Sequence, residues 1–214
     1  STSPLNSHTS HYREFKKIEM EIFKDDKLIG HNYYFFKREN GFIIIENQLN
    51  FKVSLFGVDV FSIEGYGVEK YKNNKLISYE SKTLQNDKVK FVNLVYLPEE
   101  DKFNINGSSY TGLANSDNII GNWWNHEILQ ANSQISPMSG SIKKQIVTFL
   151  SNEQIVLYGK TIDAEHFKLT SKDMNIPKDK RLDFDIWYNS KNSMIVKIAY
   201  SRMGNWEYRL KNFE

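Results

Sequence analysis

Cysteine is absent from this chain of 214 residues, which excludes disulfide bonds, thiolate metal sites and cysteine nucleophiles together. Proline (4 residues) and glycine (11 residues) are too few for a collagen-like or low-complexity chain. No apolar run approaches the roughly 20 residues that a membrane-spanning helix requires. A formal net charge of +2 provides no long-range field toward nucleic acid or anionic lipid. We therefore expect a globular domain with no integral membrane span and no nucleic-acid partner.

Aromatic residues are what the chain has in excess: 14 Phe, 12 Tyr and 4 Trp. The first ten residues are polar and carry no apolar periodicity, which predicts a disordered tail over residues 1–10. The remainder contains no Pro-rich or Gly/Ser-rich linker, so residues 11–214 are predicted to form a single domain.

Alternation of apolar and polar residues is the dominant pattern, interrupted by turn residues, and it is typical of antiparallel strands. Residues 43–55 form the longest such segment, and Asn40-Gly41 before it is the strongest hairpin signal, since both residues tolerate positive φ. Further turns are predicted at residues 25–26, 73–74, 151–152 and 163–164. The count is about eleven to thirteen strands, with one short helix near residues 123–131.

So many strands cannot remain flat, and they curl, close or stack. We therefore predict an all-β fold: a strongly curved antiparallel sheet, as a half-barrel or open barrel, with the helix as a plug. Such a sheet encloses a cavity, and an aromatic-rich lining suits an apolar ligand. The alternative for any individual aromatic residue is that it simply belongs to the core.

Metal and cofactor motifs are missing from the sequence. The five histidines show neither HxH nor HExxH spacing, and no Gly-rich phosphate loop or GxSxG elbow occurs. We predict no metal site and no cofactor. The histidines are His8, His11, His31, His126 and His166.

The most distinctive local cluster is residues 122–127, which place two tryptophans next to a potential acid/base pair, His126 and Glu127. One interpretation is a helical lid with an aromatic anchor and a titratable histidine at the cavity mouth. The other is that Trp124 plugs the barrel while Asn122 caps the helix.

Several carboxylates could support acid/base chemistry. Glu69 and Glu80 flank the turn at residues 73–74 and could be cross-strand neighbours, and Glu64 lies nearby. Asp183 and Asp185 share one strand face with Trp187, as the paired acids and aromatic platform of a glycosidase would. Alternating acids are also typical of the solvated face of an amphipathic strand.

Six segments along the chain carry a family resemblance: IFKDDKLIGH (22–31), LFGVDVF (55–61), EKYKNNKLISYESKT (69–83), WWN (123–125), DIWY (185–188) and EYR (207–209). Together they resemble a bacterial domain-of-unknown-function family of exported all-β proteins (family 6134), which is distantly similar to lipoprotein-carrier half-barrels. Where that family has a turn glycine, this chain has Asp26 and Asn74, both tolerable at positive φ. The resemblance implies export, a curved antiparallel sheet and a lipophilic ligand, but no reaction.

The leading hypothesis is a periplasmic or secreted bacterial binding or carrier protein that holds an apolar or amphiphilic, lipid-like molecule. The alternative is a small hydrolase, lyase or isomerase in which His126 or His31 works with Glu64, Glu69 or Glu80. A third reading, a carbohydrate-binding module, requires Trp187 and Trp206 to be exposed and coplanar. The predicted ligand-binding residues are Trp123, Trp124, Asn125, His126, His31, Trp187 and Tyr188.

Overall fold

The computed structural model describes residues 15–214; the tail predicted at residues 1–10 lies outside this range. The described chain is all-β and forms one open sheet of 15 strands, ordered β8-β7-β6-β5-β4-β3-β2-β1-β15-β14-β13-β12-β11-β10-β9. All neighbouring strands pair antiparallel except β9 and β10, which are parallel. The prediction of an all-β fold built on one curved sheet that does not close is thus confirmed.

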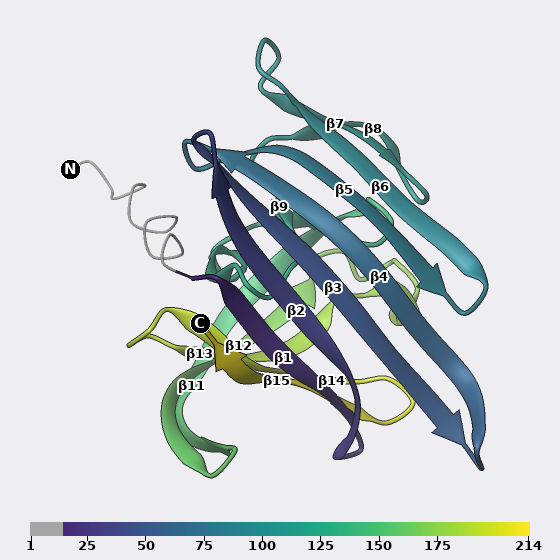
Figure 1. The fold of residues 1–214 in the computed structure, drawn as a ribbon, viewed down its shortest axis with the longest axis vertical. Helices are drawn as coiled ribbons and strands as arrows, with labels where there is room; N and C mark the ends of the chain where they lie inside the picture. Colours follow the sequence, from purple (N-terminus) through teal and green to yellow (C-terminus); the bar gives the residue numbers. More distant parts are fainter. Residues whose placement is uncertain (1–14) are drawn as a thin grey trace.

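The first half of the sheet, β1–β8, is a meander of hairpins, and the second half, β9–β15, joins it through the pairing of β1 with β15. Figure 1 shows most of the second half lying behind the first. The strands of the first half are β1 (Lys17–Lys24), β2 (Lys27–Glu39), β3 (Phe42–Leu55), β4 (Val58–Lys72), β5 (Lys75–Gln85), β6 (Lys88–Leu97), β7 (Lys102–Gly107) and β8 (Thr111–Asn115).

The second half contains seven strands and two single-turn 3₁₀ helices, η1 and η2. Its elements are β9 (Ile119–Ile120), η1 (His126–Leu129), β10 (Ser133–Ile135), β11 (Ile142–Leu157), β12 (Lys160–Ser171), η2 (Lys178–Lys180), β13 (Asp183–Asn189), β14 (Met194–Ser201) and β15 (Asn205–Phe213).

The hairpin turns follow the sequence pattern closely. Both central residues have positive φ at Asn40-Gly41 (51° and 80°) and at Asn73-Asn74 (49° and 67°), the geometry that two-residue hairpins need to match strand twist. Asp26 adopts a φ of 63°, so Asp26 and Asn74 serve where the family has glycine. Phe56 also adopts a positive φ, 51°, in the β3–β4 turn.

Three details differ from the sequence prediction. The helix expected over residues 123–131 is only the four-residue η1, because Asn125 is extended (φ −102°, ψ 102°) and caps a single turn. The turns predicted at residues 151–152 and 163–164 are wrong: β11 continues through the first with a register shift, and β12 through the second. The strand count is 15, since β9 and β10 are too short to show periodicity.

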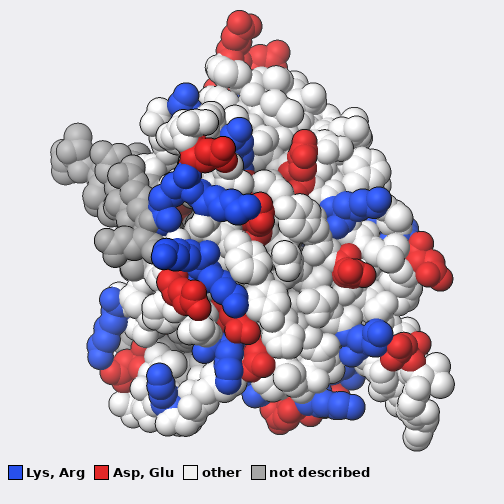
Figure 2. Space-filling model, in the orientation of Figure 1, with Lys and Arg blue, Asp and Glu red and all other residues white. Residues whose placement is uncertain are grey.

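The inner face of the sheet carries the core and the cavity described below. Along β2 the buried residues alternate strictly: Asn32, Tyr34 and Phe36 point inward, while His31 and Tyr33 point outward. One core cluster is built from both halves, with Met20, Ile22 and Phe51 packing with residues of β12–β15. On the face shown in Figure 2, positive and negative side chains are interspersed rather than gathered, as the small net charge implies.

The described residues contain no helix with the length and apolar character needed to cross a bilayer.

Candidate functional site

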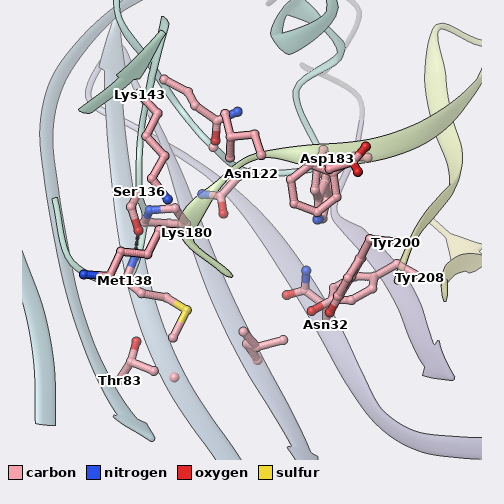
Figure 3. Close-up of a pocket in the computed structure, with 18 of the residues that line it drawn as sticks. Asn32, Thr83, Asn122, Ser136, Met138, Lys143, Lys180, Asp183, Tyr200 and Tyr208 are labelled. Carbon is pink, nitrogen blue, oxygen red and sulfur yellow. Dashed lines mark hydrogen bonds between the residues drawn. The ribbon is translucent and has the colours of Figure 1, made fainter. Parts of the chain in front are cut away.

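A cavity of about 710 Å³ lies between the two halves of the sheet (Figure 3). The first half contributes residues of β2–β5, and the second half contributes residues of β11–β15. The segment 121–138 and the loop around η2 complete the lining. Its volume falls within the ~300–1,000 Å³ range of pockets that hold a small organic ligand.

The absence of two side chains on β4 leaves room for this cavity. Gly65 and Gly67 occupy successive inward positions and pair with Leu49 and Asn47 on β3. A Cβ atom at Gly67 would approach the Tyr79 hydroxyl to 2.8 Å. Side chains at these two positions would therefore crowd the floor of the cavity.

The floor is polar and its groups are held in place by hydrogen bonds. The Asn32 amide donates to the Tyr34 hydroxyl (2.9 Å), which also accepts from the Trp123 backbone N–H (3.1 Å). Burial raises the pKa of Tyr34, so its phenol remains neutral. Tyr79 and Ser81 on β5 both donate to the Pro137 carbonyl, which ties segment 121–138 to the first half.

Aromatic rings form the opposite wall. Trp123 meets Phe184 edge to face, with centroids 5.1 Å apart, and Phe184 meets Tyr200 in the same way at 5.4 Å. Tyr208 and Leu49 add further apolar area. The combination of a polar floor and an aromatic wall is suited to an amphiphilic molecule.

The wall depends on a buried carboxylate outside the cavity lining. Glu69 is only 2% exposed and accepts hydrogen bonds from the Tyr71 hydroxyl (2.7 Å), the Asn122 amide (2.9 Å) and the Trp124 indole (2.6 Å). Burial raises its pKa to about 7, against the lowering effect of the three donors. Glu69 thus anchors the residues on either side of Trp123 to β4.

The sequence of residues 20–211 matches the family described as Domain of unknown function (DUF6134). The chain belongs to the DUF6134 family. The family description assigns neither an activity nor a ligand. No curated protein matches the chain.

The predicted ligand-binding residues occupy different places in this DUF6134 chain. Trp123 lines the cavity, whereas Trp124 is in the core against Phe36 and Tyr71. Asn125 is buried and caps η1 by accepting from the Glu127 N–H (3.0 Å). His126 is buried and stacks on Tyr188, with ring centroids 5.6 Å apart, and neither ring contributes to the cavity lining.

His31, Glu69 and Glu80, which the enzyme hypothesis invoked, do not share a face of the sheet. His31 points outward on β2, stacks on Tyr33 and lies 3.6 Å from Glu21. Glu80 is exposed on β5, and so is Glu64 on β4, whereas Glu69 points inward. Glu69 therefore faces the opposite side of the sheet from His31, Glu64 and Glu80, so it does not join them in one group.

The carbohydrate-module reading required exposed tryptophans. Trp187 is 9% exposed and Trp206 is 6% exposed. Neither ring is therefore available as a platform for a sugar, and the structure removes this reading.

Trp187 instead belongs to a cluster on the outer face of β11–β13 that the sequence did not reveal. His166 lies between Glu153 (Nδ1 to Oε2, 2.5 Å) and Asp185 (Nε2 to Oδ1, 2.8 Å) and stacks on Trp187 at 4.3 Å. Lys168 also binds Asp185 (3.1 Å). The available signal was the cross-strand register that brings His166 to Trp187 and Lys168 to Asp185, which requires knowing the strand pairing.

This outer cluster is suited to holding strands together. Each ring nitrogen of His166 faces a carboxylate oxygen, so neither nitrogen is left to exchange a proton with a substrate. The paired acids predicted at Asp183 and Asp185 are likewise engaged by Lys168. The cluster links β11, β12 and β13, and we assign it no chemistry.

Proposed function

We propose that this protein is a binding or carrier protein that holds one lipid-like, amphiphilic molecule in the cavity between the two halves of its sheet. The observation that carries the proposal is the cavity of about 710 Å³ with its aromatic wall and hydrogen-bonded polar floor. A periplasmic or secreted location in a bacterium is part of the proposal and is supported by the sequence resemblance described above. Fractionation of the source cells tests the location.

A neutral fluorescent amphiphile, N-phenyl-1-naphthylamine, tests the cavity directly. Its fluorescence should rise on binding to the wild-type protein, and the substitution Leu49→Trp should abolish that rise. Leu49 lines the cavity and pairs with Gly65 across the strands, so a larger ring there extends over the glycine into the empty volume.

The matched control is Leu84→Trp, because Leu84 is 42% exposed on the outer face of β5. This control should bind the probe as the wild type does. An organic extract of the purified protein, analysed by mass spectrometry, should also release a stoichiometric amphiphile. The proposal is wrong if the probe does not bind or if both tryptophan variants bind it equally well.

A further inference from the structure

Lys178 and Arg181 are among the cations that line the cavity, and four further cations on it or near it lie close enough together for their charges to interact. Lys143 (β11), Lys180 (η2) and Arg202 (after β14) line the cavity, and Lys90 (β6) is close enough for its charge to be affected by both Arg202 and Lys180. Figure 3 shows Lys143 and Lys180 on the side of the cavity opposite Tyr200 and Tyr208. We call these four residues the basic rim.

Two acids, Asp179 and Asp183, lie in the cavity lining beside the basic rim, but neither forms an ion pair with it in the described residues. Within residues 15–214, none of its four members forms an ion pair with a carboxylate, whereas other lysines of the chain, such as Lys37 and Lys168, do. Arg202 donates to the Asp179 backbone carbonyl, a contact that orients the guanidinium without neutralising it. Asp183, at the edge of the cavity, is engaged by Lys168 at 2.8 Å.

The positive charges of the basic rim repel one another. Partial burial lowers the pKa of Lys143, and the charges of Arg202, Lys180 and Lys90 lower it further, with only Asp179 acting in the opposite direction. Partial burial and neighbouring cations likewise lower the pKa of Lys90. Uncompensated like charges are unfavourable in a partly desolvated site, and a bound anion relieves that repulsion.

We propose that the basic rim binds the anionic oxygen head of the amphiphile, a carboxylate or a phosphate monoester, while its apolar chain lies along the aromatic wall. Guanidinium and ammonium groups donate charge-assisted hydrogen bonds to these oxyanions. The wall of Trp123, Phe184 and Tyr200 faces the same cavity, so head and chain have adjoining binding surfaces. This inference rests on the proposed function and names the ligand class for it.

The test uses three ligands with the same fourteen-carbon chain: tetradecanoate, tetradecyl phosphate and tetradecanol. Each displaces N-phenyl-1-naphthylamine from the full chain at low ionic strength. Both anions should bind about tenfold or more tightly than the alcohol, and added salt should reduce the difference, because charge–charge attraction is screened. The anion that binds more tightly shows whether the site prefers a carboxylate or a phosphate head group.

Two matched variants assign the effect to the rim. Lys143→Gln should reduce the preference for the anions by bringing their affinities closer to that of the alcohol. Lys144→Gln removes the same charge from the neighbouring residue, which is exposed on the other face of β11, and it should retain the preference. Circular dichroism should show that both variants are folded.

The outcomes separate the two proposals. If the alcohol and the anions bind the wild type equally, the anionic-head proposal is overturned and the proposed carrier function stands. If the preference exists but Lys143→Gln and Lys144→Gln behave alike, the assignment to the rim is overturned. If neither the probe nor any ligand binds, both proposals fail.

Discussion

At the scale of single residues, Glu69 is the most unusual group in the protein, a carboxyl that is buried at the centre of three donors. The two donors on segment 121–138, Asn122 and Trp124, flank Trp123 of the cavity wall. One side chain on β4 therefore helps to fix the position of a cavity-lining residue through the two neighbours of that residue. The pKa of Glu69, raised to about 7 by burial, makes this anchor sensitive to pH.

The stability of the protein should reflect the titration of Glu69. A carboxyl whose pKa is higher in the folded protein binds its proton more tightly there. Its contribution to stability is therefore full below the unfolded value of 4.5 and is lost as the pH rises toward about 7. Over this pH range the free energy of unfolding should fall by about 3 kcal/mol. Urea unfolding between pH 4.5 and 7.5, followed by tryptophan fluorescence, measures it.

Glu69→Gln is the matched variant. An amide can accept from Asn122 and Trp124 and donate to the Tyr71 hydroxyl, as the protonated carboxyl can. This variant should unfold with a flatter pH dependence than the wild type between pH 4.5 and 7. Parallel pH profiles for the two proteins would contradict the assignment of the titration to Glu69.

At the scale of elements, features that depend on adjacent residues could be predicted from the sequence, whereas features that depend on contacts between distant residues could not. The turns at Asn40-Gly41 and Asn73-Asn74 are set by the residues themselves, because these types tolerate positive φ. Residues 151–152 resembled a turn but lie within β11, where pairing with β12 continues past the register shift. The helix predicted over residues 123–131 is only the single turn η1, and the residues before it are held by a distant contact: Asn122 and Trp124 donate to Glu69, more than fifty residues earlier in the chain.

The candidate site shows the same division. Alternation along β2 showed which residues share a face, but which face is concave depends on how the whole sheet curves. His31 was therefore predicted to bind the ligand although it points outward, while its neighbours Asn32 and Tyr34 line the cavity. The basic rim was not predictable, because its members come from four separate elements. Trp123, which lines the cavity, was singled out from the sequence only as part of a conspicuous local cluster.

The β11–β12 hairpin is an element whose stability can be tested separately from the cavity. Its tip reaches the outer face of β1, where Tyr158 donates to Glu21 (2.7 Å), and Leu157 packs with Trp187 and Val196. Leu157→Ala removes this buried contact and should destabilise the docked hairpin by about 2 kcal/mol. Hydrogen exchange of amides 152–165 should accelerate, and binding of the neutral probe should be unchanged.

The control for the hairpin is Val156→Ala, since Val156 is 68% exposed on the opposite face of the same strand. Amide exchange in this control should match the wild type. If Leu157→Ala left the exchange of the hairpin unchanged, the tip would not be held by this outer cluster of apolar side chains.

At the scale of the whole molecule, the excess of aromatic residues acquires two separate roles. Trp123, Phe184 and Tyr200 form a wall facing the cavity, while Trp124, Phe36 and Tyr71 pack in a core cluster. Trp187 lies on the outer face under the β11–β12 hairpin. Only part of the aromatic content therefore faces the cavity, while another part packs in the core and some rings, such as Phe56, are exposed.

Because the two halves share core residues, the prediction that residues 11–214 form one domain can be tested by unfolding. Ile186 on β13 is fully buried in the cluster that also contains Met20, Ile22 and Phe51 of the first half. Ile186→Ala should lower the free energy of unfolding by about 2–5 kcal/mol. Hydrogen exchange of amides in β3–β5 reports the first half, and exchange of amides in β12–β14 reports the second.

Both signals should shift together in Ile186→Ala and remain near the wild type in Ile146→Ala, where the same substitution removes a side chain that is 48% exposed. A common shift is expected because loss of the shared core weakens every strand that packs on it. If exchange in β12–β14 accelerated while β3–β5 retained wild-type protection, the halves would unfold independently. The cavity would then lie between two separately stable units rather than within one domain.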